Sequence, residues 1–148
     1  MLTSDMKTLI TNHRAGMMAT INDDGTPSVS PKATFVIIDD ARIAVGNIRS
    51  PGTVANLRKR PAVEVCFIDV VTRKAVRATG TATITPKAKA EPVLMGAFER
   101  EWADYLDDIS AFIDITVTAA ELILSPGYDL GFTEDELKAQ NLAKLNAL

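Results

Sequence analysis

The 148 residues of this sequence include only one cysteine and one histidine. Their small number bears on disulfides, metal sites and His-based catalysis. A single cysteine, Cys66, can form neither a disulfide within the chain nor a cysteine-based metal site. With His13 as the only imidazole, we expect no zinc site and no His-based catalytic triad within one chain. Cys66 lies in the apolar run 63–68. We interpret it as a small core residue, because free cysteine is usually buried.

Long apolar runs and net charge are also scarce. No stretch approaches the ~20 apolar residues of a membrane span, and the N-terminus, with Asp5 and Lys7, has no signal-like segment. The 16 basic and 19 acidic residues leave a net charge of -3, which gives no broad basic surface for nucleic acid or an anionic membrane. We therefore expect a cytoplasmic protein with neither partner, in which a local cluster of donors holds any anionic ligand.

The sequence does have the composition of one globular domain, with 47% hydrophobic and 24% charged residues. We expect a single domain over 1–148. Gly80 stands in mid-strand, where glycine indicates a bulge or the close approach of another backbone. Alternating polarity and turn signals predict six strands, and Pro61 and a capping box at Thr133 delimit two helices. The predicted strands are 17–22, 27–38, 41–46, 62–70, 75–85 and 111–124; the predicted helices include 4–15, 53–60 and one after Thr133.

Six short strands with a few helices predict a mainly β domain with flanking helices. Closure into a barrel removes exposed strand edges, so a closed or split six-stranded β-barrel is favoured over an open sheet.

The connection 47–56 is the first candidate site. Arg49, Ser50 and Gly52 lead into a helix expected to begin at Thr53. Free backbone N–H groups and the positive end of the helix dipole favour an anion there, and Arg49 can add a bidentate bond to a phosphate. The alternative is an ordinary capped helix beside a solvated arginine.

The second candidate site is the strand 27–38. Alternation places Ser30, Lys32 and Thr34 on one face, and we expect the opposite, apolar face, with Val29 and Ala33, to lie inside the barrel. The polar row then either meets the rim of a heterocycle or faces water. Pro31 removes a ladder donor, which predicts an edge strand or a bulge.

The order of these motifs resembles the pyridoxamine 5′-phosphate oxidase-like family of FMN-binding split β-barrels. The resemblance extends over about 9–84 and, more loosely, 113–124. It rests on the segment 17–27, the Ser-Pro-Lys strand, the Gly-Asn-Ile-Arg-Ser-Pro-Gly-Thr loop and the Val-Arg-Ala-Thr-Gly-Thr-Ala strand. It implies a six-stranded split barrel that forms a homodimer, with FMN in the clefts between subunits.

The resemblance also assigns residues. Ser30, Pro31, Lys32 and Ala33 match the strand that meets the isoalloxazine ring and ribityl chain, and Asn47, Arg49, Ser50 and Thr53 match the segment that holds the phosphate. Asn56 matches a recurrent polar position whose role is more often structural.

The sequence departs from the family pattern in two ways, of which the first bears on the reaction and the second on the affinity for FMN. The segment after Leu124 has no arginine, whereas the oxidases clamp the substrate phosphate there, which argues against vitamin B6 oxidation. Gly52 and Thr53 stand at two positions that are commonly basic in the oxidase phosphate loop.

Three functions stay open at this stage. The first is a flavin-dependent oxidoreductase acting on a small-molecule substrate or electron donor, with no catalytic side chain identified. The second is a non-enzymatic flavin-binding or electron-transfer module, and the third is the same fold with the deazaflavin F420 or haem. The position of His13 before the barrel argues against haem. Trp102 and Tyr128 either cover a flavin or anchor the structure.

Overall fold

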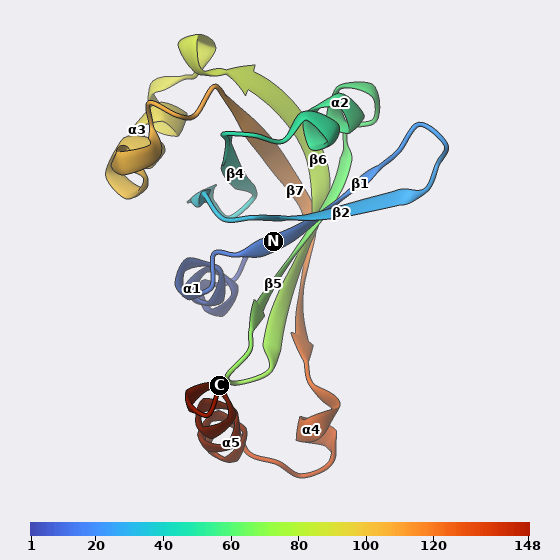
Figure 1. Ribbon diagram of the computed structural model, residues 1–148, viewed down its shortest axis with the longest axis vertical. Coiled ribbons are helices and arrows are strands. Elements are labelled where there is room, and N and C mark those ends of the chain that lie inside the picture. The colour runs from blue at the N-terminus through green and yellow to red at the C-terminus, as the bar shows by residue number, and fades with distance from the viewer.

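The computed structural model describes residues 1–148 as one antiparallel sheet with flanking helices (Figure 1). The strands are β1 (Gly16–Ile21), β2 (Pro27–Lys32), β3 (Phe35–Asp39), β4 (Arg42–Asn47), β5 (Ala62–Asp69), β6 (Lys74–Pro86) and β7 (Ala111–Leu124). The helices are α1 (Ser4–Asn12), α2 (Pro51–Lys59), α3 (Pro92–Glu101), α4 (Pro126–Asp129) and α5 (Glu134–Asn146), with 3₁₀ turns η1 (Lys87–Lys89) and η2 (Ala103–Tyr105). None of the helices has the length and apolarity to cross a membrane.

The mainly β class is confirmed, but the count of six strands is wrong. The sheet has seven strands in the order β2-β1-β5-β6-β7-β4-β3, because the strand expected over 27–38 breaks at Ala33 and Thr34. A tight turn makes the break: the Phe35 N–H donates to the Ala33 carbonyl at 2.8 Å. The two halves, β2 and β3, lie at opposite edges of the sheet.

The break also changes which residues face inward. Ser30 pairs with the buried Met18 and shares its inner face, whereas in β3 the odd-numbered Phe35 belongs to the barrel core and the even-numbered Val36 to the cluster under α3. Val29 is therefore 58% exposed on the outer face, and Ala33 is exposed as well. The expectation that both lie inside the barrel is wrong, because alternation does not continue in phase through a turn.

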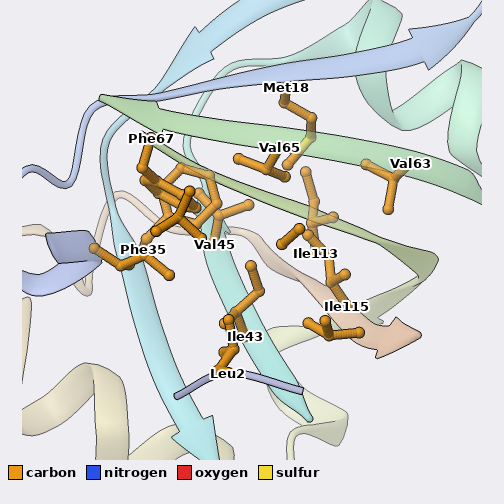
Figure 2. Packing of buried hydrophobic residues seen from close by; sticks show 14 of the residues in the cluster. Leu2, Met18, Phe35, Ile43, Val45, Val63, Val65, Phe67, Ile113 and Ile115 are labelled. Carbon is orange, nitrogen blue, oxygen red and sulfur yellow. The ribbon is translucent and has the colours of Figure 1, made fainter. Parts of the chain in front are cut away.

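The barrel core is a cluster of 18 buried residues from α1, α2, the N-terminus and all strands except β2. Figure 2 shows its centre, where Phe35 and Phe67 meet edge to face with ring centroids 4.7 Å apart. A second, smaller cluster lies under α3, where Phe98 stacks on Phe112 at 4.4 Å. Cys66 is not a core residue: it lies half-buried on the outer face of β5, and burial raises the pKa of its thiol.

Gly80 marks a bulge, as its position in mid-strand predicted. The pairing of β6 with β7 shifts register between Thr79 and Gly80. A Cβ built on Gly80 would lie 2.0 Å from the carbonyl oxygen of Thr116. Only glycine allows this approach of the two backbones.

Trp102 and Tyr128 both have anchoring roles in this structure. The Trp102 Nε1–H donates to the Phe35 carbonyl at 2.9 Å, and the Arg14 guanidinium lies 5.4 Å from the indole ring. The Tyr128 hydroxyl donates to the Thr72 carbonyl at 2.6 Å. That bond fixes α4 to the turn between β5 and β6. In Figure 1 this turn lies at the opposite end of the molecule from α2.

Candidate functional site

The N-terminus of α2 leaves two backbone donors without an intrahelical partner. The helix begins at Pro51, two residues before the expected start, because proline suits the first helical position. The Val54 N–H is the first to bond within the helix, to the Ser50 carbonyl at 3.0 Å, and proline has no N–H. The N–H groups of Gly52 and Thr53 therefore point out of the positive end of the helix dipole.

The polar face of β2 meets this helix end. Ser30 Oγ lies 3.3 Å from Thr53 Oγ1, and the Lys32 ammonium donates to Ser30 Oγ at 2.8 Å. Thr53 is only 8% exposed. The structure thus brings Lys32, Ser30 and Thr53 from two separate sequence motifs into one connected cluster.

The end of β4 is bonded to Thr34, the third member of the polar row that the sequence predicted with Ser30 and Lys32. Its hydroxyl donates to the Gly46 carbonyl at 2.8 Å, and the Gly46 N–H donates back to the Thr34 carbonyl at 3.0 Å. The next residue, Asn47, has a buried Oδ1 with no hydrogen-bond partner. The amide Nδ2 of the same side chain donates to Ser110 Oγ at 3.5 Å. Because a buried acceptor normally has a donor, Oδ1 is the one unsatisfied atom of this amide in the ligand-free protein.

Uncompensated positive charge is the main electrostatic feature of the site. Arg49 is exposed on the loop before α2, and neither Arg49 nor Lys32 takes part in any ion pair of the protein. Burial lowers the pKa of the Lys32 ammonium, and no carboxylate opposes that effect. Two cations without a counter-ion beside a helix N-terminus can hold an anion.

Two of the predicted site residues have side chains that point away from this cluster, and a third, Ser50, stands at the start of α2. The side chains of Pro31 and Ala33 are exposed and alternate away from Ser30 and Lys32, so the structure does not bring them into the cluster. Ser50 is half-buried at the N-cap position, but its hydroxyl makes no capping bond. Its side chain is therefore free of the structural role that a capping serine usually has.

Asn56 has the structural role that the resemblance implied. Its Nδ2 donates to Thr20 Oγ1 and to Asn22 Oδ1, both at 3.0 Å, and the side chain is buried. These bonds fix α2 against β1 and against the turn that follows it. The direction of the α2 N-terminus, and hence of its free N–H groups, depends on this contact.

The largest hollow of the surface is a groove of about 360 Å³ on the outer face of β1, β5 and β6. It is mostly apolar, and its lining includes the small residues Ala19, Ala62 and Gly80. None of the eight predicted site residues lines it. The groove is therefore separate from the cationic cluster.

Lys32→Met is expected to stabilise the ligand-free protein at pH 7 by about 0.5 kcal/mol. The folded state lowers the pKa of Lys32 from 10.5, so its charge costs stability below the lowered pKa, and the cost disappears as the pH rises through 10.5. Urea unfolding at pH 7 and 10.5 measures the gain and its loss, with Lys138→Met, at an exposed lysine, as the control. A less stable Lys32→Met protein at pH 7 would show that the bond to Ser30 outweighs burial.

The family model described as pyridoxamine 5′-phosphate oxidase matches residues 2–122. The structure of HupZ from Group A Streptococcus is 26% identical, covers 84% of this chain and 96% of its own, and superposes with a TM-score of 0.72. No curated protein matches significantly.

Two more distant structures show the same fold. A FAD-binding protein from Mesorhizobium loti is 18% identical, with a TM-score of 0.63 over 80% of this chain and 89% of its own. An F420 reductase is 23% identical, with a TM-score of 0.56 over 72% of this chain and 88% of its own. The split-barrel fold expected from the sequence is thus confirmed. Since the family model matches most of its length, the chain belongs to the pyridoxamine 5′-phosphate oxidase-like family.

Proposed function

We propose that this protein is a flavoprotein that binds FMN at the N-terminus of α2. The observation that carries the proposal is the bonded cluster of Lys32, Ser30 and Thr53 at the start of α2, where Lys32 has no ion-pair partner and the N–H groups of Gly52 and Thr53 have no acceptor. Arg49 and the unpaired Asn47 Oδ1 belong to the segment that leads into this helix. Each has the charge or hydrogen-bonding capacity that a phosphorylated polyol with a polar ring requires. Relatives named as a FAD-binding protein and an F420 reductase support a flavin-type cofactor.

The phosphate would be held by Arg49, the Ser50 and Thr53 hydroxyls and the N–H groups of Gly52 and Thr53. Asn47 Oδ1 would accept a hydrogen bond from the ribityl chain. Lys32 would face the ring from β2, and Pro31 and Ala33 would contribute through backbone atoms only, since their side chains point away.

A bound flavin supplies two-electron transfer to or from a small-molecule substrate, and the protein supplies orientation and electrostatics. Lys32 would hold positive charge beside the N1–C2=O side of the ring, where negative charge develops on reduction. Arg49 and the α2 N-terminus would fix the opposite end of the cofactor. An oxidoreductase of unknown substrate is the reading that these roles support.

We also propose that the site is completed in a homodimer. The outer face of β2, β1 and β5 exposes Val29, Met17 and Ile68 at 58%, 44% and 45%, and the same face carries the apolar groove. Exposed apolar surface of this kind marks interaction sites. A second copy packed there would bury this surface, and the family resemblance implies that the cofactor lies between the two copies. The cytoplasmic location expected from the sequence stays a prediction.

Specific observations favour two alternatives within the same fold. No carboxylate or imidazole belongs to the cluster as a proton donor, which suits a non-enzymatic flavin carrier or electron-transfer module. Pro51 has no N–H, and Gly52 and Thr53 replace basic residues of the oxidases, so the site holds less positive charge. A phosphodiester such as that of F420 has one negative charge fewer than a phosphate monoester at neutral pH, and it suits that lower charge.

Arg49→Ala tests the proposal. Loss of a charged partner of the phosphate is expected to weaken FMN binding by about 1.5–3 kcal/mol, or roughly 10- to 150-fold in Kd. Quenching of FMN fluorescence measures the Kd. Arg58→Ala is the matched control, because Arg58 is also exposed and unpaired but lies in the last turn of α2. Equal affinity of the two variants would remove Arg49 from the site.

A further inference from the structure

We infer that Ser30 is a positioning residue rather than a cofactor contact: it connects Lys32 to Thr53 in a one-directional chain of hydrogen bonds that ends on the anion bound at the α2 N-terminus. The inference rests on the proposed function and changes the role that the family resemblance gives to Ser30. It makes Lys32 a determinant of phosphate affinity that acts through two hydroxyl groups.

The chemistry of lysine sets the direction of the first hydrogen bond in this series, and we infer the direction of the second. An ammonium group has only donors, so Ser30 Oγ must accept the bond from Lys32 Nζ at 2.8 Å. The hydrogen of the Ser30 hydroxyl is then available for Thr53 Oγ1, which lies 3.3 Å away. A bond from a charged donor polarises the accepting hydroxyl and makes it a stronger donor in turn.

Thr53 is the end of the chain inside the protein. Its hydroxyl makes no other hydrogen bond, not even the common one to the carbonyl four residues earlier in a helix. If Thr53 Oγ1 accepts from Ser30, its own hydrogen is left for a ligand. It would then act beside the free N–H groups of Thr53 and Gly52, which point out of the same helix end.

The strand geometry explains why Ser30 takes this place. Ser30 and Lys32 are two residues apart in β2 and therefore share a face, so the lysine side chain leans back along the strand to reach the hydroxyl. That face looks inward because Ser30 pairs with the buried Met18. A serine one residue earlier or later would face away from α2.

This series of hydrogen bonds predicts that the affinities for FMN and for riboflavin respond differently to the loss of Ser30. Ser30→Ala removes the connection but leaves Lys32, Thr53 and the helix in place. It is expected to weaken FMN binding about fivefold and to leave riboflavin, which has no phosphate, unchanged within twofold. A Ser30 that contacts the ring or the ribityl chain directly would weaken both ligands alike, and that result would overturn the inference.

A double-mutant cycle tests the coupling itself. Lys32→Met and Thr53→Val are combined, and FMN dissociation constants are measured with Ser30 intact and in the Ser30→Ala background. With Ser30 intact, the double variant is expected to lose at least threefold less affinity than the product of the two single losses. In the Ser30→Ala background the losses multiply. Two results would contradict the hydrogen-bonded connection. One is that the losses of FMN affinity multiply in both backgrounds, and the other is that Lys32 and Thr53 remain coupled in the Ser30→Ala protein.

Two further measurements separate this inference from the proposed function. Ser30→Thr keeps a hydroxyl and is expected to keep the coupling, which a merely structural role for Ser30 would not require. Inorganic phosphate, titrated against the amide resonances of Gly52 and Thr53, replaces FMN if the wild-type protein binds no flavin. If phosphate shifts the amide resonances of the wild-type protein and Ser30→Ala reduces these shifts, the hydrogen-bonded connection is supported even though the flavin proposal fails. If phosphate causes no shifts, or if Ser30→Ala leaves them unchanged, the connection is overturned.

Discussion

Gly80→Ala is expected to lower the free energy of unfolding by about 4 kcal/mol, a large part of the ~5–15 kcal/mol of a typical domain. The new Cβ would lie 2.0 Å from the Thr116 carbonyl oxygen, 2.9 Å from its carbon and 3.2 Å from the Val117 Cα. All three are backbone atoms, so no side chain can rotate away. Relief requires β6 and β7 to separate, and their pairing is the longest in the sheet.

Gly52→Ala is the matched control for this result. Nothing lies within 4 Å of a Cβ built on Gly52, and its backbone is helical. Its stability is expected to stay within about 1 kcal/mol of the wild-type value. Urea unfolding followed by Trp102 fluorescence and circular dichroism measures both variants. A Gly80→Ala midpoint equal to that of Gly52→Ala would show that β6 and β7 do not pair with this bulge.

Asn56→Leu is expected to cost about 3 kcal/mol of stability and to weaken FMN binding as well. Leucine removes the Nδ2 group that donates both hydrogen bonds. The Oγ1 of Thr20, a residue that is only 4% exposed, and the Oδ1 of Asn22 then lose their donor. The same two bonds direct α2, so the free N–H groups at its N-terminus lose their fixed position.

Asn12→Leu provides the control for Asn56→Leu, because Asn12 is exposed at the end of α1 and makes no side-chain hydrogen bond. Unfolding in urea and FMN titration under stabilising conditions separate the two effects. An Asn56→Leu protein with lower stability and unchanged FMN affinity would show that α2 keeps its direction without this contact.

The sequence predicted much of the fold because its local signals were consistent. Turn residues separated the strands, alternation marked β6 and β7, and Gly80 marked the bulge. It failed over 27–38, where the pattern of apolar residues continues past Ala33 but the chain turns. A turn is hard to predict when its residues include neither glycine nor an Asn-Gly pair. The hydrogen bonds between Thr34 and Gly46 join residues that are distant in the sequence, so the sequence alone does not show them.

The candidate site could be predicted in part for the same reason. Charge and helix-start signals located Arg49 and Thr53, and the family resemblance added the β2 residues. The bond network among Lys32, Ser30 and Thr53, and the buried acceptor of Asn47, depend on how two distant segments meet. Pro31 and Ala33 were included because the family resemblance assigns them to the strand that meets the ring, and in the structure their side chains are exposed on the opposite side from Ser30 and Lys32.

Visible absorption of the purified protein, recorded before and after addition of FMN and desalting, tests the central claim most directly. We expect the bands of oxidised flavin to stay with the wild-type and Arg58→Ala proteins and to be reduced or lost with Arg49→Ala. A wild-type protein that stays colourless after desalting and does not quench FMN fluorescence would contradict FMN binding at α2. The fold would be unaffected, and F420 or a role without a flavin would then have to be tested.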